Sequence, residues 1–272
     1  MLMTKSKYLL VVSVLLACSS GTPTNGGPSV QPPPPPPPTP PTSPSDLVLH
    51  TTLDGPSSVA VPAHGVGTQA TIETAPANDF VAALIGSGLR TNAIGERIRF
   101  PQSDGRTQNV ELERGTMEFW YRPGYNHDDN HKYTIVGTGN WSGLNGGGAG
   151  SIHFGKHNNT NFNMIFLIFF DANRVRWEHN VAATDFSWRA GDWVLFRLTW
   201  DFGVPPGQQN LHVYMNGREL PLKGQVSRGP QPVPVESENE KIYIGSRDTQ
   251  GNIIGNGVYD DVRIWNKVIP PA

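Results

Sequence analysis

Strict alternation of apolar and polar residues predicts a β-hairpin between Asp192 and Leu220. The first half places apolar residues at every second position: Val194, Phe196, Leu198, Trp200 and Phe202. This spacing puts them on one face of a strand, which we expect to face a core. The second half alternates in the same way and reaches Asn216-Gly217, a pair that favours a type I′ turn. The pattern therefore predicts a strand pair with one buried face, placed in the middle of a β-sandwich.

Similar short runs recur along the chain between turn residues and predict about a dozen strands. Outside the hairpin, the runs are Asp46–Leu53, Glu96–Phe100, Asn109–Glu113, Thr116–Tyr121, Lys132–Gly137, Ser151–Phe154, Phe162–Phe170, Arg174–His179, Lys241–Ile244 and Gly257–Trp265. The run from Phe162 to Phe170 is apolar on both faces, so we expect an interior strand that is covered on both sides. The fold class that this pattern predicts is all-β.

The N-terminus predicts a secretory signal over residues 1–17. Lys5 and Lys7 precede an apolar stretch from Tyr8 to Ala17, which is shorter than the roughly 20 residues that a membrane-spanning helix needs. Cys18 follows directly and is the only cysteine of the chain, so it has no internal disulfide partner. Leu15 to Cys18 resembles the bacterial lipobox, which implies lipidation of Cys18. An ordinary signal peptide with an incidental cysteine is the alternative.

Residues 18–45 form a proline-rich linker between the predicted anchor and a globular head over residues 46–272. Pro32 to Pro38 is an unbroken proline run, and such a segment is extended and stiff. At about 3.1 Å per residue, Pro32 to Pro44 would span roughly 40 Å. We interpret the linker as a spacer rather than as a ligand for a proline-recognising domain. Ser19 after the cysteine resembles the pattern that permits export to the outer membrane in Gram-negative bacteria, which implies a location at the outer membrane or cell surface.

Charge argues against nucleic acid as a partner. The 272-residue chain has a net charge of −2, and removal of the signal takes away two lysines and no acidic residue, which leaves −4. A weakly acidic protein without basic runs lacks the electrostatic attraction on which nucleic-acid binding depends.

Three segments resemble the laminin G-like and concanavalin A-like jelly rolls, and they occur in the order of those domains. They are Gly115–Arg122, the pair Trp193–Trp200 and Leu211–Arg218, and the closing pair Ile242–Gly245 and Val258–Asn266. The head is therefore similar to bacterial LamG-like jelly-roll lipoproteins. This resemblance implies two packed antiparallel sheets with a concave face. It implies no single activity, because the fold carries lectins, glycosidases, lyases and adhesion modules.

We expect no enzymatic activity. Glucanases of this superfamily place their carboxylates on one strand as Glu-x-Asp-x-(x-)Glu, whereas Glu236 to Glu240 lacks the central Asp and follows a run of prolines. Ser151–Phe154 is only faintly similar to a lyase strand, and Gly143–Gly150 lacks the end of a phosphate-binding loop. A polysaccharide-cleaving hydrolase or lyase with an atypical site is the alternative.

Two places are candidates for a metal ion. Asn126–His131 contains two imidazoles and two carboxylates, although a solvated connection between strands is the simpler interpretation. The resemblance implies the second place: Asp260 holds the position of an aspartate that often binds structural Ca²⁺, with oxygens from Asp54 or its neighbours. Hard oxygen ligands suit Ca²⁺. The alternative is that Asp260 only accepts backbone hydrogen bonds.

The predicted non-core face suggests carbohydrate binding, because sugars stack on aromatic rings and their hydroxyls bind nearby polar side chains. The ligand-binding candidates are Trp193, Arg197, His212, Tyr214, Tyr243, Arg263 and the loop residue Trp141. Trp193 and Trp265 lie near strand ends, where covering loops would make them part of a second small core instead. We therefore predict a non-catalytic head that binds a glycan or another extracellular ligand, with a protein-binding adhesion domain as the further alternative.

Overall fold

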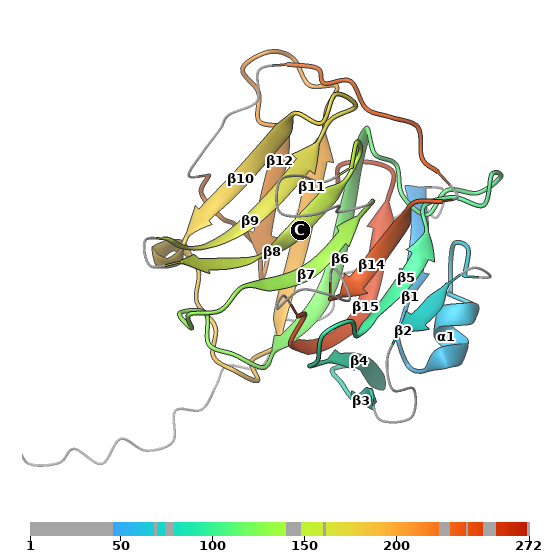
Figure 1. Ribbon diagram of the computed structural model, residues 1–272, viewed down its shortest axis with the longest axis vertical. Helices are drawn as coiled ribbons and strands as arrows, with labels where there is room; N and C mark the ends of the chain where they lie inside the picture. Colours follow the sequence, from blue (N-terminus) through green and yellow to red (C-terminus); the bar gives the residue numbers. More distant parts are fainter. Residues whose placement is uncertain are drawn as a thin grey trace, which may run out of the picture. The chain divides into compact units, whose positions relative to one another are not determined.

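Strand β6 (Arg114–Pro123) lies at the centre of one of two antiparallel sheets (Figure 1). It pairs with β11 (Val194–Asp201) on one side and with β15 (Gly257–Trp265) on the other. Its residues alternate, so that Met117, Phe119 and Tyr121 are buried in the core between the sheets. Because β6 is anchored in the core along its length, the loops at its two ends start from rigid positions.

The computed structural model describes residues 46–67, 70–73, 79–139, 148–159, 162–222, 229–237, 239–246 and 254–270. The predictions for Cys18, for the proline-rich linker and for Trp141 lie outside these ranges. Within them, no helix is long and apolar enough to cross a membrane.

The described strands form two sheets, as the predicted all-β fold and the family resemblance implied. Sheet A has the order β13 (Arg218–Glu219), β12 (Leu211–Met215), β11, β6, β15, β4 (Ser87–Thr91) and β3 (Phe80–Ala82), with β1 (Leu47–Thr51) paired to β15. Sheet B has the order β10 (Arg176–Ala182), β9 (Phe162–Phe170), β8 (Ile152–Asn159), β7 (Tyr133–Thr138), β14 (Lys241–Gly245), β5 (Arg97–Pro101) and β2 (Thr71–Glu73). The short helices are α1 (Pro56–Ala60) and the 3-10 turn η2 (Ala183–Asp185). Figure 1 looks onto sheet B, with sheet A behind it.

The alternation read from the hairpin is confirmed. All of its predicted core residues are buried in one cluster: Val194, Phe196, Leu198, Trp200, Phe202, Leu211, Val213 and Met215. Asn216 and Gly217 have φ of 51° and 79°, the left-handed pair that a type I′ turn requires, and they join β12 to β13. The hairpin does not occupy the middle of its sheet, however, because β6 holds that place.

Strand β9 is an interior strand of sheet B, between β8 and β10, as its two apolar faces predicted. Ile165, Leu167 and Phe169 point into the core. On the opposite face, Ile168 and Phe170 are only 3% and 5% exposed. Both faces of the second half of β9 are therefore covered.

The predicted strand Asn109–Glu113 is wrong. Val110 and Leu112 are buried in the core, which explains the alternation. The carbonyl oxygen of Glu111 accepts a hydrogen bond from Trp200 Nε1 at 2.9 Å, and that of Glu113 accepts one from the Phe202 amide at 2.8 Å. The segment is thus tied to the end of β11 by single bonds instead of a strand ladder.

Candidate functional site

The outer face of sheet A carries five of the predicted ligand residues: Trp193, Arg197, His212, Tyr214 and Arg263. Each alternates with a core residue on or beside β11, β12 or β15. The sequence thus placed them correctly on a common non-core face. Whether they can bind a ligand depends on what each side chain already contacts.

Arg197 is held in an internal ion pair. Its Nε and Nη2 atoms both lie 2.6 Å from Glu118 Oε2, and Nη1 donates to the carbonyl oxygen of Pro270. Arg197 is 9% exposed and Glu118 is 1% exposed. Burial raises the pKa of Glu118 even though Arg197 acts to lower it. The C-terminal segment thus crosses the face at this point and takes one of the donors of Arg197.

The other members of this face also have partners. His212 Nδ1 lies 2.6 Å from Glu219 Oε1, and its ring stacks on that of Tyr214. Arg122 lies 5.0 Å from the ring centroid of Trp193. Arg263 pairs with Asp261, which also contacts His50.

Three aromatic side chains on this face are buried. Trp265, Trp120 and Tyr214 are 2%, 0% and 9% exposed. For Trp265, the alternative of a covered strand end is therefore the correct one. The candidate residues on the outer face of sheet A therefore already have partners within the protein.

Tyr243 does not join this group. It lies on β14 of sheet B, where its hydroxyl contacts Nδ1 of His153, a residue of β8. Tyr243 is 4% exposed. The sequence pattern gives the face within a strand but not the sheet to which that strand belongs, so Tyr243 was grouped with residues of the opposite layer.

Asp54 and Asp260 meet at the turn between β3 and β4. Asp260 Oδ2 accepts the Ile85 amide at 2.8 Å, and Asp54 Oδ1 accepts the Ser87 amide at 2.9 Å. Asp260 is fully buried, its Oδ1 has no hydrogen-bond partner, and burial raises its pKa to about 6. That oxygen fits either a proton or a hard cation, although no group of three or more His, Cys, Asp or Glu that could hold a metal occurs in the described ranges. A calcium ion here would use the two carboxylates, with neutral oxygens as its other ligands.

Two loops enclose a surface groove of about 430 Å³ beyond the C-terminal end of β6. We call it the rim groove. One wall comes from the β6–β7 loop and the other from the segment between η2 and β11. Its lining residues are Asn126, His127, Asp128, Ser187, Trp188, Arg189 and Asp192.

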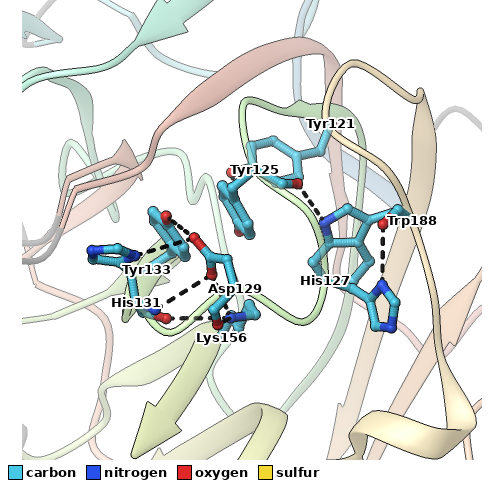
Figure 2. A network of polar contacts seen from close by, with 8 residues as sticks. All are labelled: Tyr121, Tyr125, His127, Asp129, His131, Tyr133, Lys156 and Trp188. Atoms are coloured by element: carbon cyan, nitrogen blue, oxygen red, sulfur yellow. Dashed lines mark hydrogen bonds and ion pairs between the residues drawn. The ribbon is translucent and has the colours of Figure 1, made fainter. Parts of the chain in front are cut away.

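Hydrogen bonds join the two walls of the rim groove. The amide and Nδ1 of His127 both contact the carbonyl oxygen of Trp188, at 3.2 Å and 3.1 Å. Trp188 Nε1 donates to the carbonyl oxygen of Tyr125 at 3.1 Å (Figure 2). The Ala190 amide donates to Asn126 Oδ1 at 3.0 Å. These bonds run in both directions between the loops and hold the groove at a fixed width.

Trp188 is the only aromatic lining residue of the rim groove in the described ranges; we call it the floor, and it packs against two further buried rings. Trp188 is 4% exposed and stacks on Phe186 with ring centroids 5.1 Å apart. Tyr125 meets Trp188 edge to face at 6.1 Å. The floor thus continues directly into the core, and the polar residues above it stand on a rigid base.

Exposed polar side chains stand along both walls of the rim groove. Asp128, Ser187 and Arg189 are exposed and have no side-chain partner among the described residues. A carboxylate, a hydroxyl and a guanidinium offer acceptors and donors of the kind that bind sugar hydroxyls. The sequence pattern singled out only the Asn126–His131 wall, because Ser187 to Asp192 lies in a loop without a periodic pattern. Only the position of this loop just before β11 could have indicated that it lines a groove.

A second groove of about 510 Å³ lies at the opposite end of β6, and we call it the acidic groove. Its lining residues are Gln108, Glu111, Glu113, Gln231, Val233, Pro234, Val235 and Glu236. Burial raises the pKa of Glu111, and Glu236 and Glu113 raise it further, whereas Arg114 acts to lower it. Glu236 accepts the Leu112 amide at 2.7 Å and Gln108 Nε2 at 3.0 Å. The sequence predicted that Glu236 lies in a loop, but it did not predict that Glu111 and Glu113 lie close to it.

The two sheets, their order and the loops at their rims define a lectin-like jelly roll. Residues 97–272 match the concanavalin A-like lectin/glucanases superfamily, and the chain belongs to that superfamily. No curated protein matches the chain.

Solved structures agree on the fold. The binding domain of botulinum neurotoxin serotype D is similar with a TM-score of 0.51 at 14% identity, over 83% of this chain and 49% of that one. The serotype G binding domain gives 0.50 at 16% identity, with the same coverage of 83% and 49%. Trypanosoma rangeli sialidase in complex with sialic acid gives 0.51 at 14% identity, over 84% of this chain and 32% of that one. This chain therefore spans about half of the neurotoxin domains, and at these identities the likeness establishes the fold alone.

Proposed function

We propose that this protein is a lipid-anchored surface protein whose jelly-roll head binds carbohydrate in the rim groove without cleaving it. The observation that carries the proposal is the groove itself, which is lined by the buried Trp188 and by Asp128, Ser187 and Arg189, three exposed residues without side-chain partners among the described residues. Trp188 is too deeply buried to act as a stacking platform, so it supplies the shape of the floor. The wall residues supply the hydrogen bonds.

Two further facts support a glycan as the ligand. The superfamily includes lectins by its description, and the sialidase with the same fold is in complex with sialic acid. In contrast, Arg197, His212 and Tyr214 on the outer face of sheet A are already engaged within the protein. The proposed site therefore moves from that face to the rim groove.

Binding is tested on an array of neutral and sialylated oligosaccharides with the full-length chain. We expect Arg189→Ala to weaken binding of any glycan that the wild type retains by at least about tenfold, the usual effect of losing one charged hydrogen bond. Arg106→Ala is the matched control, because Arg106 is an exposed arginine outside both grooves. Equal binding by the two variants would exclude the rim groove as the site.

Anchoring through Cys18 is the second part of the proposal. It rests on the apolar stretch before Cys18, on the absence of any other cysteine in the sequence, and on the proline-rich linker that follows. We expect Cys18→Ala to leave an unprocessed precursor and to move the protein out of the detergent phase in a bacterial host. Unchanged processing and unchanged partition of the variant would contradict lipidation.

The acidic groove supports a second candidate function, hydrolysis of a polysaccharide. Glu111 has a raised pKa and lies close to the carboxylates of Glu113 and Glu236, and such pairing occurs in carboxylate active sites. The test is release of reducing ends from polysaccharides by the wild type, by Glu111→Gln and by Glu236→Gln. Cleavage that either substitution abolishes would establish the enzyme, and a lack of cleavage by the wild type on substrates that it binds would favour the lectin.

A further inference from the structure

Lys156 is a lysine inside the hydrophobic core. It lies on β8, where Ile152 and Phe154 point between the sheets, and the two-residue period directs Lys156 to the same side. Its side chain is 0% exposed. A lysine is almost never fully buried unless its charge is paired, so its contacts indicate why it is there.

Every N–H group of the Lys156 ammonium has an acceptor in the β6–β7 loop (Figure 2). Nζ donates to the carbonyl oxygen and to Oδ1 of Asp129, at 2.6 Å and 2.7 Å, and to the carbonyl oxygen of His131 at 3.3 Å. The rings of Tyr125 and Tyr133 stack with centroids 3.5 Å apart, and Nζ lies 5.8 Å and 5.6 Å from them. One buried cation thus holds two backbone carbonyls, one carboxylate and the rings at both ends of the loop.

Asp129 completes the connection. Its Oδ2 accepts a hydrogen bond from Tyr133 at 2.5 Å and lies 3.3 Å from His131 Nδ1. Burial alone would raise the pKa of Asp129, but the hydrogen bonds from Lys156 and Tyr133 lower it below its usual value. Asp129 is therefore an ionised partner of Lys156, and its carboxylate is fully used within the protein. A metal ion at Asn126–His131 stays a prediction, and such an ion would compete with Lys156 for the Asp129 carboxylate.

The loop that Lys156 holds is also one wall of the rim groove. Asn126, His127 and Asp128 lie between Tyr125, which rests against Lys156, and Asp129, which bonds to it. On their other side, Asn126 and His127 bond to the opposite wall. The wall is therefore fixed from the core by Lys156 and from the surface by the η2–β11 segment.

We propose that Lys156 is a positioning residue for the rim groove, whose buried ammonium selects a single conformation of the β6–β7 loop. This inference rests on the proposed function of that groove. A buried ion pair adds little net stability compared with apolar residues of similar size, because desolvation offsets the attraction. Its effect is on which loop conformation is populated. Removal of the pair should therefore loosen the loop more than it destabilises the fold.

Hydrogen exchange of the full-length chain, followed by mass spectrometry, tests the inference without any ligand. In the double variant Lys156→Met with Asp129→Asn, we expect the amides of residues 126–131 to exchange at least about tenfold faster, because local opening becomes easier. The amides of β8 and β9 should keep their wild-type rates. Lys132→Met, a change of an exposed lysine in the same loop, is the control and should leave all rates unchanged. A folded double variant with wild-type exchange across residues 126–131 would overturn the proposal.

The wild type provides a measurement that does not depend on a variant folding. The amides of His127 and Asp129 donate to Trp188 and Asn126, at 3.2 Å in both cases. If Lys156 fixes the loop, these amides exchange slowly, at rates close to those of the core strands. Rapid exchange of both in the wild type would also overturn the proposal. Neither result depends on whether a glycan binds, so failure of the proposed function is seen separately on the array.

Discussion

The two grooves lie beyond opposite ends of the same strand, and they are built in different ways. The rim groove stands on the buried rings of Trp188 and Tyr125, and a lysine inside the core holds one of its walls. The acidic groove is lined by carboxylates whose fixed contacts are backbone and side-chain amides near the surface. A groove supported by the core can therefore present exposed polar groups in a fixed arrangement. In the acidic groove, by contrast, the charges of neighbouring carboxylates help to set the pKa of Glu111.

The largest expected effect is that of removing the floor of the rim groove. Trp188→Ala should lower the free energy of unfolding by about 3–5 kcal/mol, the usual loss for a buried Trp, and should abolish glycan binding. Val235 is the matched apolar residue of the acidic groove and is 83% exposed, so Val235→Ala should change the stability by less than about 0.5 kcal/mol. Urea unfolding measures both values. Similar losses for the two variants would mean that the grooves do not differ in their support.

Calcium provides the next test, because it separates the Asp54 and Asp260 pair from the acidic groove. If Ca²⁺ binds at Asp260, free metal at a hundredfold excess over its dissociation constant stabilises the fold by about 2.7 kcal/mol. EDTA should then lower the melting temperature by several degrees, and Asp260→Asn should remove that difference whereas Glu236→Gln should not. Loss of the EDTA effect in Glu236→Gln alone would instead place the ion in the acidic groove. If EDTA leaves the wild-type melting curve unchanged, Asp260 holds no structural calcium ion.

The pH dependence in EDTA gives a second measurement on Asp260. Its pKa is raised from 3.8 to about 6 by burial, so the folded state holds a proton that the unfolded state has already lost. The stabilisation from this proton is complete below pH 3.8 and is lost as the pH rises through about 6. Asp260→Asn should abolish this loss, because an amide does not ionise. A wild type without metal that gains stability over this range would contradict the burial of a protonated Asp260.

The sequence was informative where the two-residue alternation of a strand alone determines which side chains are buried. Alternation predicted the core face of β11 and β12, and Asn216-Gly217 predicted the turn that joins β12 to β13. Both features are set by neighbours along the chain. Alternation failed at Asn109–Glu113, because Val110 and Leu112 are buried in the core although this segment forms no strand among the described residues. It could not tell that Tyr243 lies in the other sheet, since pairing is decided by distant segments.

The candidate site was less predictable for the same reason. Lys156 carried a signal, since it takes a core position in an alternating strand and a buried lysine requires a counterion. Nothing local identified Asp129 as that counterion, because the partner comes from another loop. The opposite wall, with Trp188 and Arg189, lies in a segment without period, and only the tertiary fold brings it to Asn126.

A smaller effect is expected from Glu236→Gln, which tests how hydrogen bonds and charge hold the acidic groove. Glu236→Gln keeps one acceptor for the Leu112 amide but removes a charge, so we expect it to lower stability by no more than about 1 kcal/mol. Loss of that negative charge should also lower the pKa of Glu111, because Glu236 helps to raise it. Carboxyl NMR titration of the two proteins measures this shift. An unchanged pKa of Glu111 would mean that Glu236 does not contribute to raising it.

The smallest expected effect is that acid changes the local stability of the two grooves in opposite directions. The pKa of Asp129 is lowered from 3.8, because the hydrogen bonds from Lys156 and Tyr133 outweigh burial. Its contribution to stability is therefore present above pH 3.8 and is lost as the pH falls through its folded pKa. The pKa of Glu111 is raised from 4.5, mainly by burial, so its contribution is complete below pH 4.5 and is lost as the pH rises.

Hydrogen exchange, corrected for the intrinsic effect of pH, follows both grooves in one experiment. Between about pH 5 and pH 3, residues 126–131 should lose protection, whereas the Leu112 region should keep or gain it. In Asp129→Asn, the loss of protection at residues 126–131 should no longer depend on pH, because the titrating partner of Lys156 is gone. Parallel loss of protection at both grooves would mean that acid acts on the whole sandwich, and the two ends of β6 would then not be independent.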